Sequence, residues 1–156
     1  MQRVIQRFGG TRPGTWLFRT LLLPVDRRLV RASGGRFSIP RTLLGLPVVA
    51  LTTTGARTGR LRTVPVVAIR FGDALALLGT NFGQPRAPAW TANLAAHPQA
   101  WVSWRGARWP LAAHRASSAD AEHVWALATV LYPGFAAYRR RVTQRGIDVW
   151  ILEPAA

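Results

Sequence analysis

The chain contains no cysteine, and it has only six carboxylate side chains and three histidines. Without cysteine, disulfides, thiolate metal sites and cysteine nucleophiles are excluded. The histidines, His97, His114 and His123, lie far apart in sequence and lack the spacing of metal ligands. Because the carboxylates are scattered singly, we expect neither a metal site nor a paired-carboxylate hydrolase.

Lysine is also absent, so all 21 basic residues are arginine and the formal net charge is +15. A partner of this chain is therefore expected to be anionic: a phosphorylated cofactor, nucleic acid or an anionic membrane surface. A GC-rich genome would also produce an arginine-only composition, so composition alone does not decide. Where arginine does contact a ligand, its planar fork suits phosphate and carboxylate groups.

Length and hydrophobicity limit the number of domains. With 156 residues, 49% of them hydrophobic and 17% charged, the chain is long enough for one domain with a buried core. Residues 1–14 contain Gly9, Gly10, Pro13 and Gly14 and are expected to be loosely ordered. Residues 15–156 are then expected to form a single domain that begins with a helix.

Strand and turn patterns dominate the middle of the chain. Strands are predicted at residues 47–54, 62–71, 74–80, 99–104, 108–115 and 147–152. Gly72-Asp73 and Arg105-Gly106 predict tight turns between neighbouring strands. Helices are predicted at residues 88–96, 118–131 and from Pro133 to a stop at Gly146. Six strands with short flanking helices predict an α+β fold built on a small barrel.

The N-terminal helix allows two interpretations. It is predicted over residues 15–32, with one apolar face formed by Phe18, Leu22, Val25 and Leu29. Pro24 interrupts this helix or opens a second one. An amphipathic helix with Trp16 and several arginines could lie on an anionic membrane, whereas the competing hypothesis is packing on the barrel or on a partner subunit.

The apolar run at residues 16–25 contains Arg19 and is too short to span a bilayer. It also lacks the small-residue cleavage site of a signal peptide. We therefore expect a cytoplasmic protein, with peripheral contact at the inner face of the cell membrane through the N-terminal helix as the open alternative.

The most informative segment is VVALTTTGARTGRLRTVPVV, from Val48 to Val67. Gly55 and Gly59 permit positive φ and a close approach of the backbone to a ligand. Between the two β-branched runs lie arginines and threonine hydroxyls, namely Arg57, Arg60, Arg62, Thr54 and Thr58. Such a turn can hold a phosphate or carboxylate through charge-assisted hydrogen bonds. A basic hairpin turn that faces water is the alternative.

No set of nucleophile, base and acid can be assembled from the sequence. Ser103, Ser117 and Ser118 have no partner that their spacing places nearby. What is present is a basic turn, many small and aliphatic strand residues, and 7 Trp, 2 Tyr and 6 Phe. This inventory fits a protein that binds a large planar anionic molecule and uses the chemistry of that molecule.

Three segments together resemble the deazaflavin-dependent nitroreductase family. They are LTTTGARTGRLRTVP, GTNFGQPRAPAWTANLAAHP and the closing VWILEP, and SGGRFSIPRTLLGLP resembles the lead-in of that family. The similarity runs from Asp26 to Pro154, and the TTTG-x-x-TG-x-x-R element followed by P-x-W-x-x-N-L is a specific combination. The resemblance implies a six-stranded split β-barrel, like the flavin-reductase and FMN-binding proteins, and the 8-hydroxy-5-deazaflavin coenzyme F-420.

The resemblance also implies which residues bind the coenzyme. Arg57, Arg60 and Arg62, in the turn with Gly55, Thr58 and Gly59, would hold its phosphate and polyglutamate tail. The deazaflavin would be lined by Val64, Pro65 and Val66 and by the segment with Gly79, Asn81 and Gly83. Trp90 and Asn93 would brace that wall from the short helix. From the residues alone, Trp90 is as often a core residue as a ligand contact, and Asn93 could satisfy a nearby backbone group.

The reaction implied by the resemblance is hydride transfer from reduced deazaflavin to a quinone, nitroaromatic or enone acceptor. Thr80, Tyr132 and Tyr138 match hydroxyl-bearing catalytic positions, and the acceptor would be bound by Val67, Trp90, Phe135 and Tyr138. Phe135 keeps an aromatic wall but lacks a donor, Val67 stands where an aromatic hydroxyl can occur, and Asn81 replaces a basic residue. Helix-end packing is the alternative role of the two tyrosines.

Other functions are left open by the sequence. The same barrel could bind FMN or haem in place of the deazaflavin. A basic nucleic-acid-binding domain, whose aromatics stack on bases, is a third hypothesis. It is disfavoured because the arginines gather at turns and ends of strands. The family's barrel also suggests a homodimer in which a partner completes the site.

Overall fold

The computed structural model describes residues 13, 16, 18–33, 36–39 and 45–155. Its strands are β1 (Val48–Thr54), β2 (Leu61–Val67), β3 (Ile69–Phe71), β4 (Ala74–Leu78), β5 (Gln99–Trp104), β6 (Ala107–Arg115) and β7 (Val149–Pro154). The helices are η1 (Phe18–Leu22), α3 (Leu23–Ala32), η2 (Asn81–Gly83), α5 (Ala89–Ala96), α6 (Ser118–Leu131) and α7 (Gly134–Arg141). The expectation of a loosely ordered segment at residues 1–14 falls almost wholly outside the described residues.

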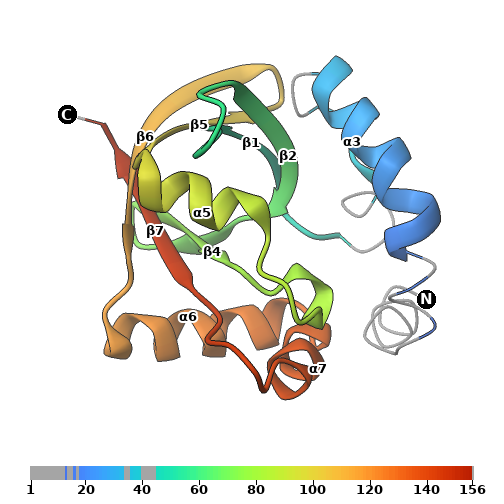
Figure 1. Cartoon of the computed structure of the whole chain (residues 1–156), viewed down its shortest axis with the longest axis vertical. Helices are drawn as coiled ribbons and strands as arrows, with labels where there is room; N and C mark the ends of the chain where they lie inside the picture. Colours follow the sequence, from blue (N-terminus) through green and yellow to red (C-terminus); the bar gives the residue numbers. More distant parts are fainter. Residues whose placement is uncertain (1–12, 14–15, 17, 34–35, 40–44, 156) are drawn as a thin grey trace.

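The strands form one curled antiparallel sheet in the order β2-β1-β5-β6-β7-β4-β3 (Figure 1). β2 and β3 lie at opposite ends of this order, yet a single residue, Ala68, joins them in sequence. The sheet therefore has to curl until its two edges meet at Ala68. The N–H of Ala68 donates to the carbonyl oxygen of Pro47 at 2.9 Å, outside either strand ladder.

The prediction of six strands was therefore wrong by one. The run at residues 62–71 reads as one continuous strand, but it is divided because β2 pairs with β1 and β3 pairs with β4. Tertiary pairing rather than local propensity decides this break. The α+β class and the antiparallel sheet are confirmed.

Alternate residues of the strands face two different cores, as the period of two requires. Val48 and Leu78 pack with α6 and α7, in a cluster that includes Val124, Trp125, Ala128, Tyr132, Phe135 and Tyr138. Their neighbours Val49 and Leu77 face the inside of the curl, in a cluster that includes Leu51, Trp90, Leu94, Val102 and Leu152. Helix α5 crosses the front of the sheet, while α6 and α7 lie across its lower end (Figure 1).

The chain between α7 and β7 also differs from prediction. Helix α7 ends at Arg141, because Val142 has φ −89° and ψ 86° and leaves the helix. Residues 142–148 instead run alongside the loop that follows β4, where Arg145 donates hydrogen bonds to its carbonyl oxygens. The expected helix stop at Gly146 was therefore five residues too late.

The N-terminal helix lies alongside β2 at the edge of the sheet (Figure 1). Pro24 stands in the first turn of α3, so it opens a second helix after η1. Two residues of the apolar face predicted from the sequence, Val25 and Leu29, are 49% and 39% exposed and therefore do not pack on the sheet. Among the side chains of α3 that the structure describes, Asp26 and Val30 are buried, at 1% exposure each.

Asp26 fixes the helix to the segment that follows it. Its carboxylate accepts hydrogen bonds from the N–H of Ile39 at 2.7 Å and from the hydroxyl of Ser38 at 3.3 Å. Burial raises the pKa of Asp26 above its ordinary value, and these two hydrogen bonds offset part of the rise. On the other face, Arg31 Nε donates to the carbonyl oxygen of Thr63 on β2 at 3.2 Å.

Asp26→Asn is expected to raise the free energy of unfolding at pH 7. The folded chain binds the Asp26 proton more tightly than the unfolded chain does. The free energy of unfolding therefore includes a contribution from this proton that is fully present below the unfolded pKa, about 3.9. This contribution is lost as pH rises through the raised pKa of the folded chain. Asn keeps the oxygen that accepts from Ile39 and never ionises. Urea unfolding between pH 4 and 7 should show the two proteins converging at the acidic end. A constant difference would contradict this linkage.

Candidate functional site

A cavity of about 1020 Å³ opens beside β1 and β2, bounded by α3, α5, the loop after β4 and the α6–α7 corner. Its apolar lining includes Leu46, Val48, Val64, Pro65, Val66, Val67, Leu77, Leu78 and Trp90. Its basic lining consists of Arg27, Arg31, Arg57, Arg62 and Arg86. One carboxylate among the lining residues, Asp26, is already hydrogen-bonded at the α3 wall.

The turn between β1 and β2 forms the basic end of the cavity. Gly59 has φ +65°, and its N–H donates to the carbonyl oxygen of Gly55 at 2.8 Å. A Cβ on Gly55 would lie 2.7 Å from the hydroxyl oxygen of Thr58 and 3.1 Å from the carbonyl oxygen of Arg60, so the turn needs glycine there. The hydroxyl of Thr58 in turn accepts from the N–H of Arg60 at 3.3 Å.

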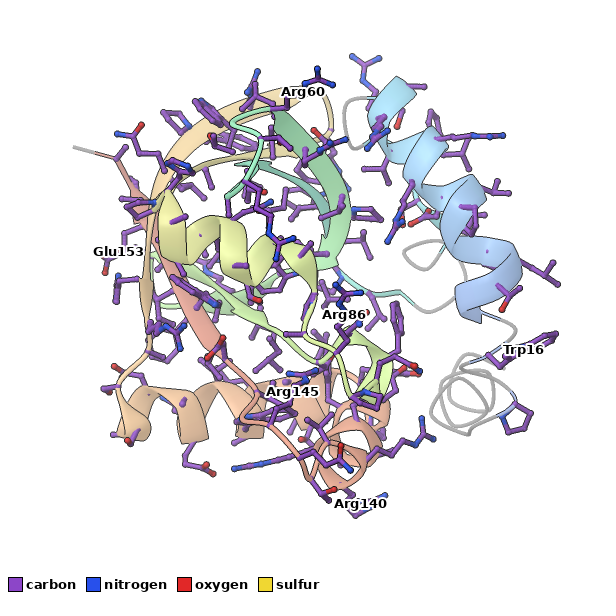
Figure 2. All side chains as sticks on the ribbon, in the orientation of Figure 1. Trp16, Arg60, Arg86, Arg140, Arg145 and Glu153 are labelled. Atoms are coloured by element: carbon purple, nitrogen blue, oxygen red, sulfur yellow. The ribbon has the colours of Figure 1, made fainter. Side chains whose placement is uncertain are left out.

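Arginines from several parts of the chain line the cavity. Arg57 and Arg62 line it from the turn and from β2, Arg27 and Arg31 from α3, and Arg86 from the loop before α5. Arg60 does not line the cavity, and Figure 2 shows it at the outer edge of the sheet, well away from Arg86. Five exposed arginines in the lining of one cavity, whose single lining carboxylate is already hydrogen-bonded, suit a ligand with several negative charges.

A half-buried apolar wall follows the basic end. Residues 64–67 of β2 are partly exposed to the cavity, and Leu77 and Leu78 of β4 lie buried in the same lining. Trp90 of α5 is 8% exposed, packs in the inner core and also borders the cavity. Its two sequence interpretations, core residue and ligand contact, therefore do not exclude each other.

Asn93 joins α5 to the basic turn through its side-chain amide. Its Oδ1 accepts from the N–H of Ala56 at 2.9 Å, and its Nδ2 donates to the hydroxyl of Thr53 at the same distance. Asn93 and Thr53 are 8% and 1% exposed. Asn93 therefore satisfies a backbone group, as one sequence alternative held, and the group that it satisfies belongs to the turn at the basic end.

Asn93→Ala is expected to lower the free energy of unfolding by about 1–3 kcal/mol, because it leaves Ala56 N–H and the buried Thr53 hydroxyl without their partner. Asn93→Asp is the matched control, since its carboxylate accepts from both groups. Thermal unfolding should rank the proteins wild type, Asn93→Asp, then Asn93→Ala. Equal losses in the two variants would show that the acceptor oxygen is not what matters.

Aromatic side chains line the opposite end of the cavity. Tyr132, Phe135 and Tyr138 are 4%, 5% and 4% exposed, and the two tyrosine hydroxyls lie 3.4 Å apart. The ring of Phe135 meets those of Tyr132 and Tyr138 edge-on at 5.7 and 6.1 Å. Burial raises the pKa of Tyr132, so its hydroxyl stays protonated and able to donate at neutral pH. Tyr132 therefore packs at the end of α6 and Tyr138 packs within α7, and both also border the cavity.

The loop after β4 supplies the remaining wall. Thr80, 6% exposed, and Asn81 both line the cavity, and Asn81 Nδ2 donates to the carbonyl oxygen of Arg86 at 2.8 Å. Asn81, Phe82 and Gly83 have φ of 45°, 56° and 73°. Such successive left-handed residues are rare for side chains other than glycine. Phe82 lines the cavity and meets the ring of Tyr138 edge-on at 6.0 Å.

Most of the residues singled out in the sequence line this one cavity: Gly55, Arg57, Thr58, Arg62, Val64, Pro65, Val66, Val67, Thr80, Asn81, Trp90, Asn93, Tyr132, Phe135 and Tyr138. Gly59, Arg60, Gly79 and Gly83 are not among the lining residues. Lining residues that the sequence did not single out include Asp26, Arg27, Arg31, Phe82 and Arg86. Arg86 lies in the segment GTNFGQPRAPAWTANLAAHP, on which the family resemblance partly rests, so its positive charge there was a usable signal.

The residues fit a planar ring system that carries an anionic tail. The apolar wall of β2 and the buried tyrosine hydroxyls suit a ring, and the arginines at the solvated end suit phosphate and carboxylate groups. Within the part of the chain that the structure describes, no group of three or more His, Cys, Asp or Glu side chains is placed to hold a metal ion. The chemistry of such a site would come from the bound organic molecule.

Comparison with known proteins agrees with this description. A curated F420H(2)-dependent quinone reductase of Mycobacterium tuberculosis is 35% identical over 92 residues, which cover 56% of this chain and 60% of that protein. The structure of an F420-H2 dependent reductase (FDR-A) superposes with a TM-score of 0.62 at 34% identity, over 69% of this chain and 94% of that one. A further solved structure, described as a domain-swapped dimer, has a TM-score of 0.65 at 29% identity, over 90% and 99% of the two chains.

The family described as F420H(2)-dependent quinone reductase matches residues 24–154. This range contains all the segments on which the resemblance to deazaflavin-dependent enzymes was based, and it confirms that resemblance. It also contains the whole curled sheet and all the residues that line the cavity. This chain therefore belongs to the F420H(2)-dependent quinone reductase family.

Proposed function

We propose that this protein is an oxidoreductase that uses the reduced deazaflavin coenzyme F-420 to reduce a quinone, a nitroaromatic compound or an enone. The observation that carries the proposal is the single cavity that joins clustered arginines, an apolar wall and two buried tyrosine hydroxyls. The relatives named as F420H2-dependent reductases support the choice of coenzyme. The fold that we propose on this basis is the split β-barrel of flavin-binding proteins.

In this proposal the turn and β2 bind the coenzyme. Arg57 and Arg62, with Arg86 opposite, hold the phosphate and the carboxylates of the tail. Val64, Pro65 and Val66 cover one face of the ring and exclude water from it. When bound, the reduced deazaflavin supplies a hydride.

The aromatic end of the cavity binds the acceptor. Phe135 and Val67 form its apolar wall, and the hydroxyl-bearing residues Tyr132, Tyr138 and Thr80 belong to the same lining. A quinone that receives a hydride at one position needs a proton on its oxygen, and a buried protonated tyrosine can donate to that oxygen. We therefore assign Tyr132, Tyr138 and Thr80 to positioning and protonation of the acceptor.

Titration of the purified protein with oxidised F-420, followed by turnover of the reduced coenzyme with menadione, tests the proposal. We expect saturable binding at low salt and oxidation of the reduced coenzyme that depends on both protein and menadione. An absorption spectrum of the protein as purified distinguishes bound FMN or haem. Failure to bind F-420, together with steep salt-dependent binding of single-stranded DNA, would favour the nucleic-acid hypothesis instead.

We also propose a homodimer, supported by the related structure that is described as a domain-swapped dimer. Size-exclusion chromatography with light scattering measures the mass directly. A mass that stays at the chain's 17.2 kDa across concentrations would reject the dimer.

We further propose that the protein is cytoplasmic and contacts the inner face of the cell membrane through its N-terminal helix. Leu21, Val25 and Leu29 lie four residues apart on one helical face and are 58%, 49% and 39% exposed. Trp16 is 59% exposed and projects away from the sheet (Figure 2). No described helix has the length and apolar character that a membrane span requires. An apolar face next to exposed arginines suits the anionic surface of the inner leaflet.

Sedimentation with vesicles tests this contact. We expect binding to vesicles of phosphatidylcholine with phosphatidylglycerol, weaker binding to phosphatidylcholine alone, and loss of binding in Leu21→Ser with Val25→Ser. Val130→Ser is the matched control, because Val130 is 87% exposed on α6, away from this helix. Unchanged binding in the double variant would reject the N-terminal helix as the contact.

A further inference from the structure

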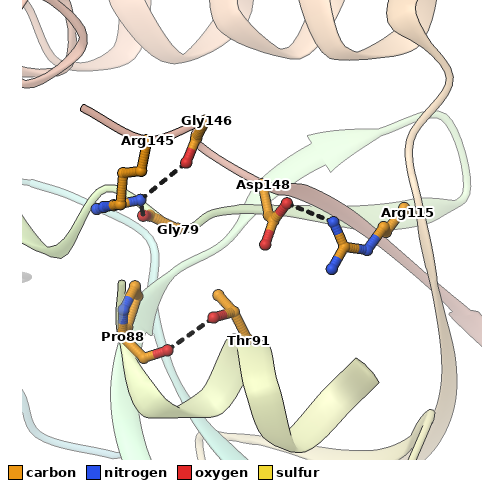
Figure 3. A network of polar contacts seen from close by, with 7 residues as sticks. All are labelled: Gly79, Pro88, Thr91, Arg115, Arg145, Gly146 and Asp148. Atoms are coloured by element: carbon orange, nitrogen blue, oxygen red, sulfur yellow. Dashed lines mark hydrogen bonds and ion pairs between the residues drawn. The ribbon is translucent and has the colours of Figure 1, made fainter. Parts of the chain in front are cut away.

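Arg145 binds an unusual set of partners, all of them carbonyl oxygens. Its Nε donates to Pro85 at 3.0 Å, its Nη1 to Gly79 and Gly146 at 3.1 Å each, and its Nη2 to Thr80 and Gln84 at 3.1 and 3.2 Å. These five bonds account for all five N–H donors of a guanidinium group. The contacts to Gly79 and Gly146 are drawn in Figure 3.

The nearby carboxylate does not take part in this arrangement. Asp148 forms an ion pair with Arg115 at 2.6 Å instead, as Figure 3 shows. Burial lowers the pKa of Arg145, with Asp148 opposing the shift. Arg145 therefore binds backbone carbonyl groups and does not form a salt bridge with Asp148.

Four of the five carbonyl groups belong to residues 79–85, the loop that contains the left-handed residues Asn81, Phe82 and Gly83. A non-glycine residue in this conformation is strained, so the loop needs external bonds to hold its shape. A hydrogen bond from a charged donor is stronger than one between neutral groups. Arg145 is therefore in the right place, and strong enough, to hold the strained turn.

Fixing the Thr80 carbonyl also fixes the next amide group. The peptide bonds of the described chain are all trans, so the N–H of Asn81 points opposite to the carbonyl of Thr80. Thr80 and Asn81 line the cavity, whereas Arg145 does not. Because Arg145 binds the Thr80 carbonyl oxygen, the N–H of Asn81 points away from Arg145. The same hydrogen bond fixes the backbone of Thr80 and so limits where the Thr80 hydroxyl can lie.

We propose that Arg145 is a positioning residue that pre-forms the ring-binding wall at residues 79–85 without touching the ligand. For the identity of the ligand this inference rests on the proposed function. Lysine cannot fully replace Arg145. An ammonium group has three donors that diverge from one nitrogen atom, whereas the five carbonyl oxygens are placed to accept from a planar guanidinium group. The role explains why an arginine stands in the irregular segment between α7 and β7.

The first test uses the protein without ligand. The amides of Gly83 and Gln84 donate to the carbonyl oxygens of Thr80 and Asn81 at 2.9 and 3.0 Å. In Arg145→Ala and Arg145→Lys we expect their hydrogen exchange to become at least 10-fold faster, while amides of the β1–β5 ladder are unchanged. Arg140→Ala, an exposed arginine on α7, is the matched control and should leave both regions as in the wild type. Unchanged exchange at residues 83 and 84 in both Arg145 variants would overturn the proposal.

The second test measures F-420 binding. We expect a rise in Kd of about 10-fold or more in Arg145→Ala, a smaller rise in Arg145→Lys, and partial recovery of Arg145→Ala on addition of millimolar guanidinium chloride. Recovery distinguishes a lost donor set from general damage to the fold. If Arg145→Ala does not fold, Arg145→Lys decides alone. If wild-type protein does not bind F-420, the proposed function is wrong, and the hydrogen-exchange result alone decides the role of Arg145. If both Arg145 variants bind F-420 with wild-type affinity, the positioning role is rejected.

Discussion

Replacing Arg57 and Arg62 together by alanine is expected to weaken F-420 binding by about 100-fold. A charge-assisted hydrogen bond contributes about 1.5–3 kcal/mol, and each 1.4 kcal/mol corresponds to a factor of ten. Both arginines are exposed, so solvent screening reduces each contribution toward the lower end of that range. Two such contributions give the expected factor. Fluorescence titration at low salt measures it, and the difference from wild type should shrink as salt is added.

General attraction between a basic protein and an anionic ligand must be separated from specific contact. Arg60→Ala combined with Arg140→Ala removes the same charge from two exposed arginines that do not line the cavity. This control should weaken binding by about threefold or less, which is the scale of a long-range effect in salt. If the two double variants lose the same affinity, the turn acts only through net charge and is not a specific site for the tail.

Local patterns in the sequence predicted most of the elements correctly. The hairpins at Gly72-Asp73 and Arg105-Gly106 lie where β3 meets β4 and β5 meets β6. The predicted helix at residues 118–131 matches α6, but the cap expected at Ser118 is Ser117, whose hydroxyl accepts from the N–H of Asp120 at 3.1 Å. These features depend on neighbours in sequence, which is why turn chemistry and capping suffice to locate them.

Features that depend on distant partners were missed. The break at Ala68 exists because β2 pairs with β1 and β3 pairs with β4. The residue types at positions 62–71 do not indicate which strands they pair with. Residues of α3 reach the cavity because Asp26 and Arg31 fix the helix beside β2. Periodicity in α3 indicated the wrong face, since Val25 and Leu29 of the predicted apolar stripe are exposed, whereas the hydrogen-bonded carboxylate of Asp26 is buried.

The candidate site divides in the same way. Arginines in one turn could be grouped from the sequence, because they lie within six residues of one another. Arg145 lies 60 positions or more from the loop carbonyls that it binds, and nothing in its neighbourhood marks it. The left-handed turn at residues 81–83 was equally hidden, because Asn81 and Phe82 are not the glycines that usually indicate positive φ.

Gly134→Ala is expected to damage the acceptor end of the cavity. A Cβ at Gly134 would lie 2.2 Å from Cε1, 2.3 Å from Cζ and 2.6 Å from the hydroxyl oxygen of Tyr132. The ring is 4% exposed and packed against Phe135 and Tyr138, so the side left open to it is the cavity that it borders, and moving there narrows the cavity. Overpacking of this kind costs about 1–3 kcal/mol, and the displaced hydroxyl would leave its position 3.4 Å from that of Tyr138.

The expected loss of stability in Gly134→Ala is opposite in sign to the usual effect of this substitution. Alanine in place of a helical glycine ordinarily stabilises a helix by up to about 1 kcal/mol. We expect Gly134→Ala to lower the melting temperature and to slow menadione reduction about 10-fold. The affinity for F-420 should stay within about twofold of wild type, since the residues that we propose to bind the coenzyme belong to the β1–β2 turn and β2 rather than to α6 or α7. Gly146→Ala is the control, as a Cβ there meets nothing within 4 Å. In a Tyr132→Leu background the added methyl should cost less, because the clash with the ring is gone. If Gly134→Ala instead behaves like Gly146→Ala in both backgrounds, the position of Tyr132 does not depend on the glycine beneath it.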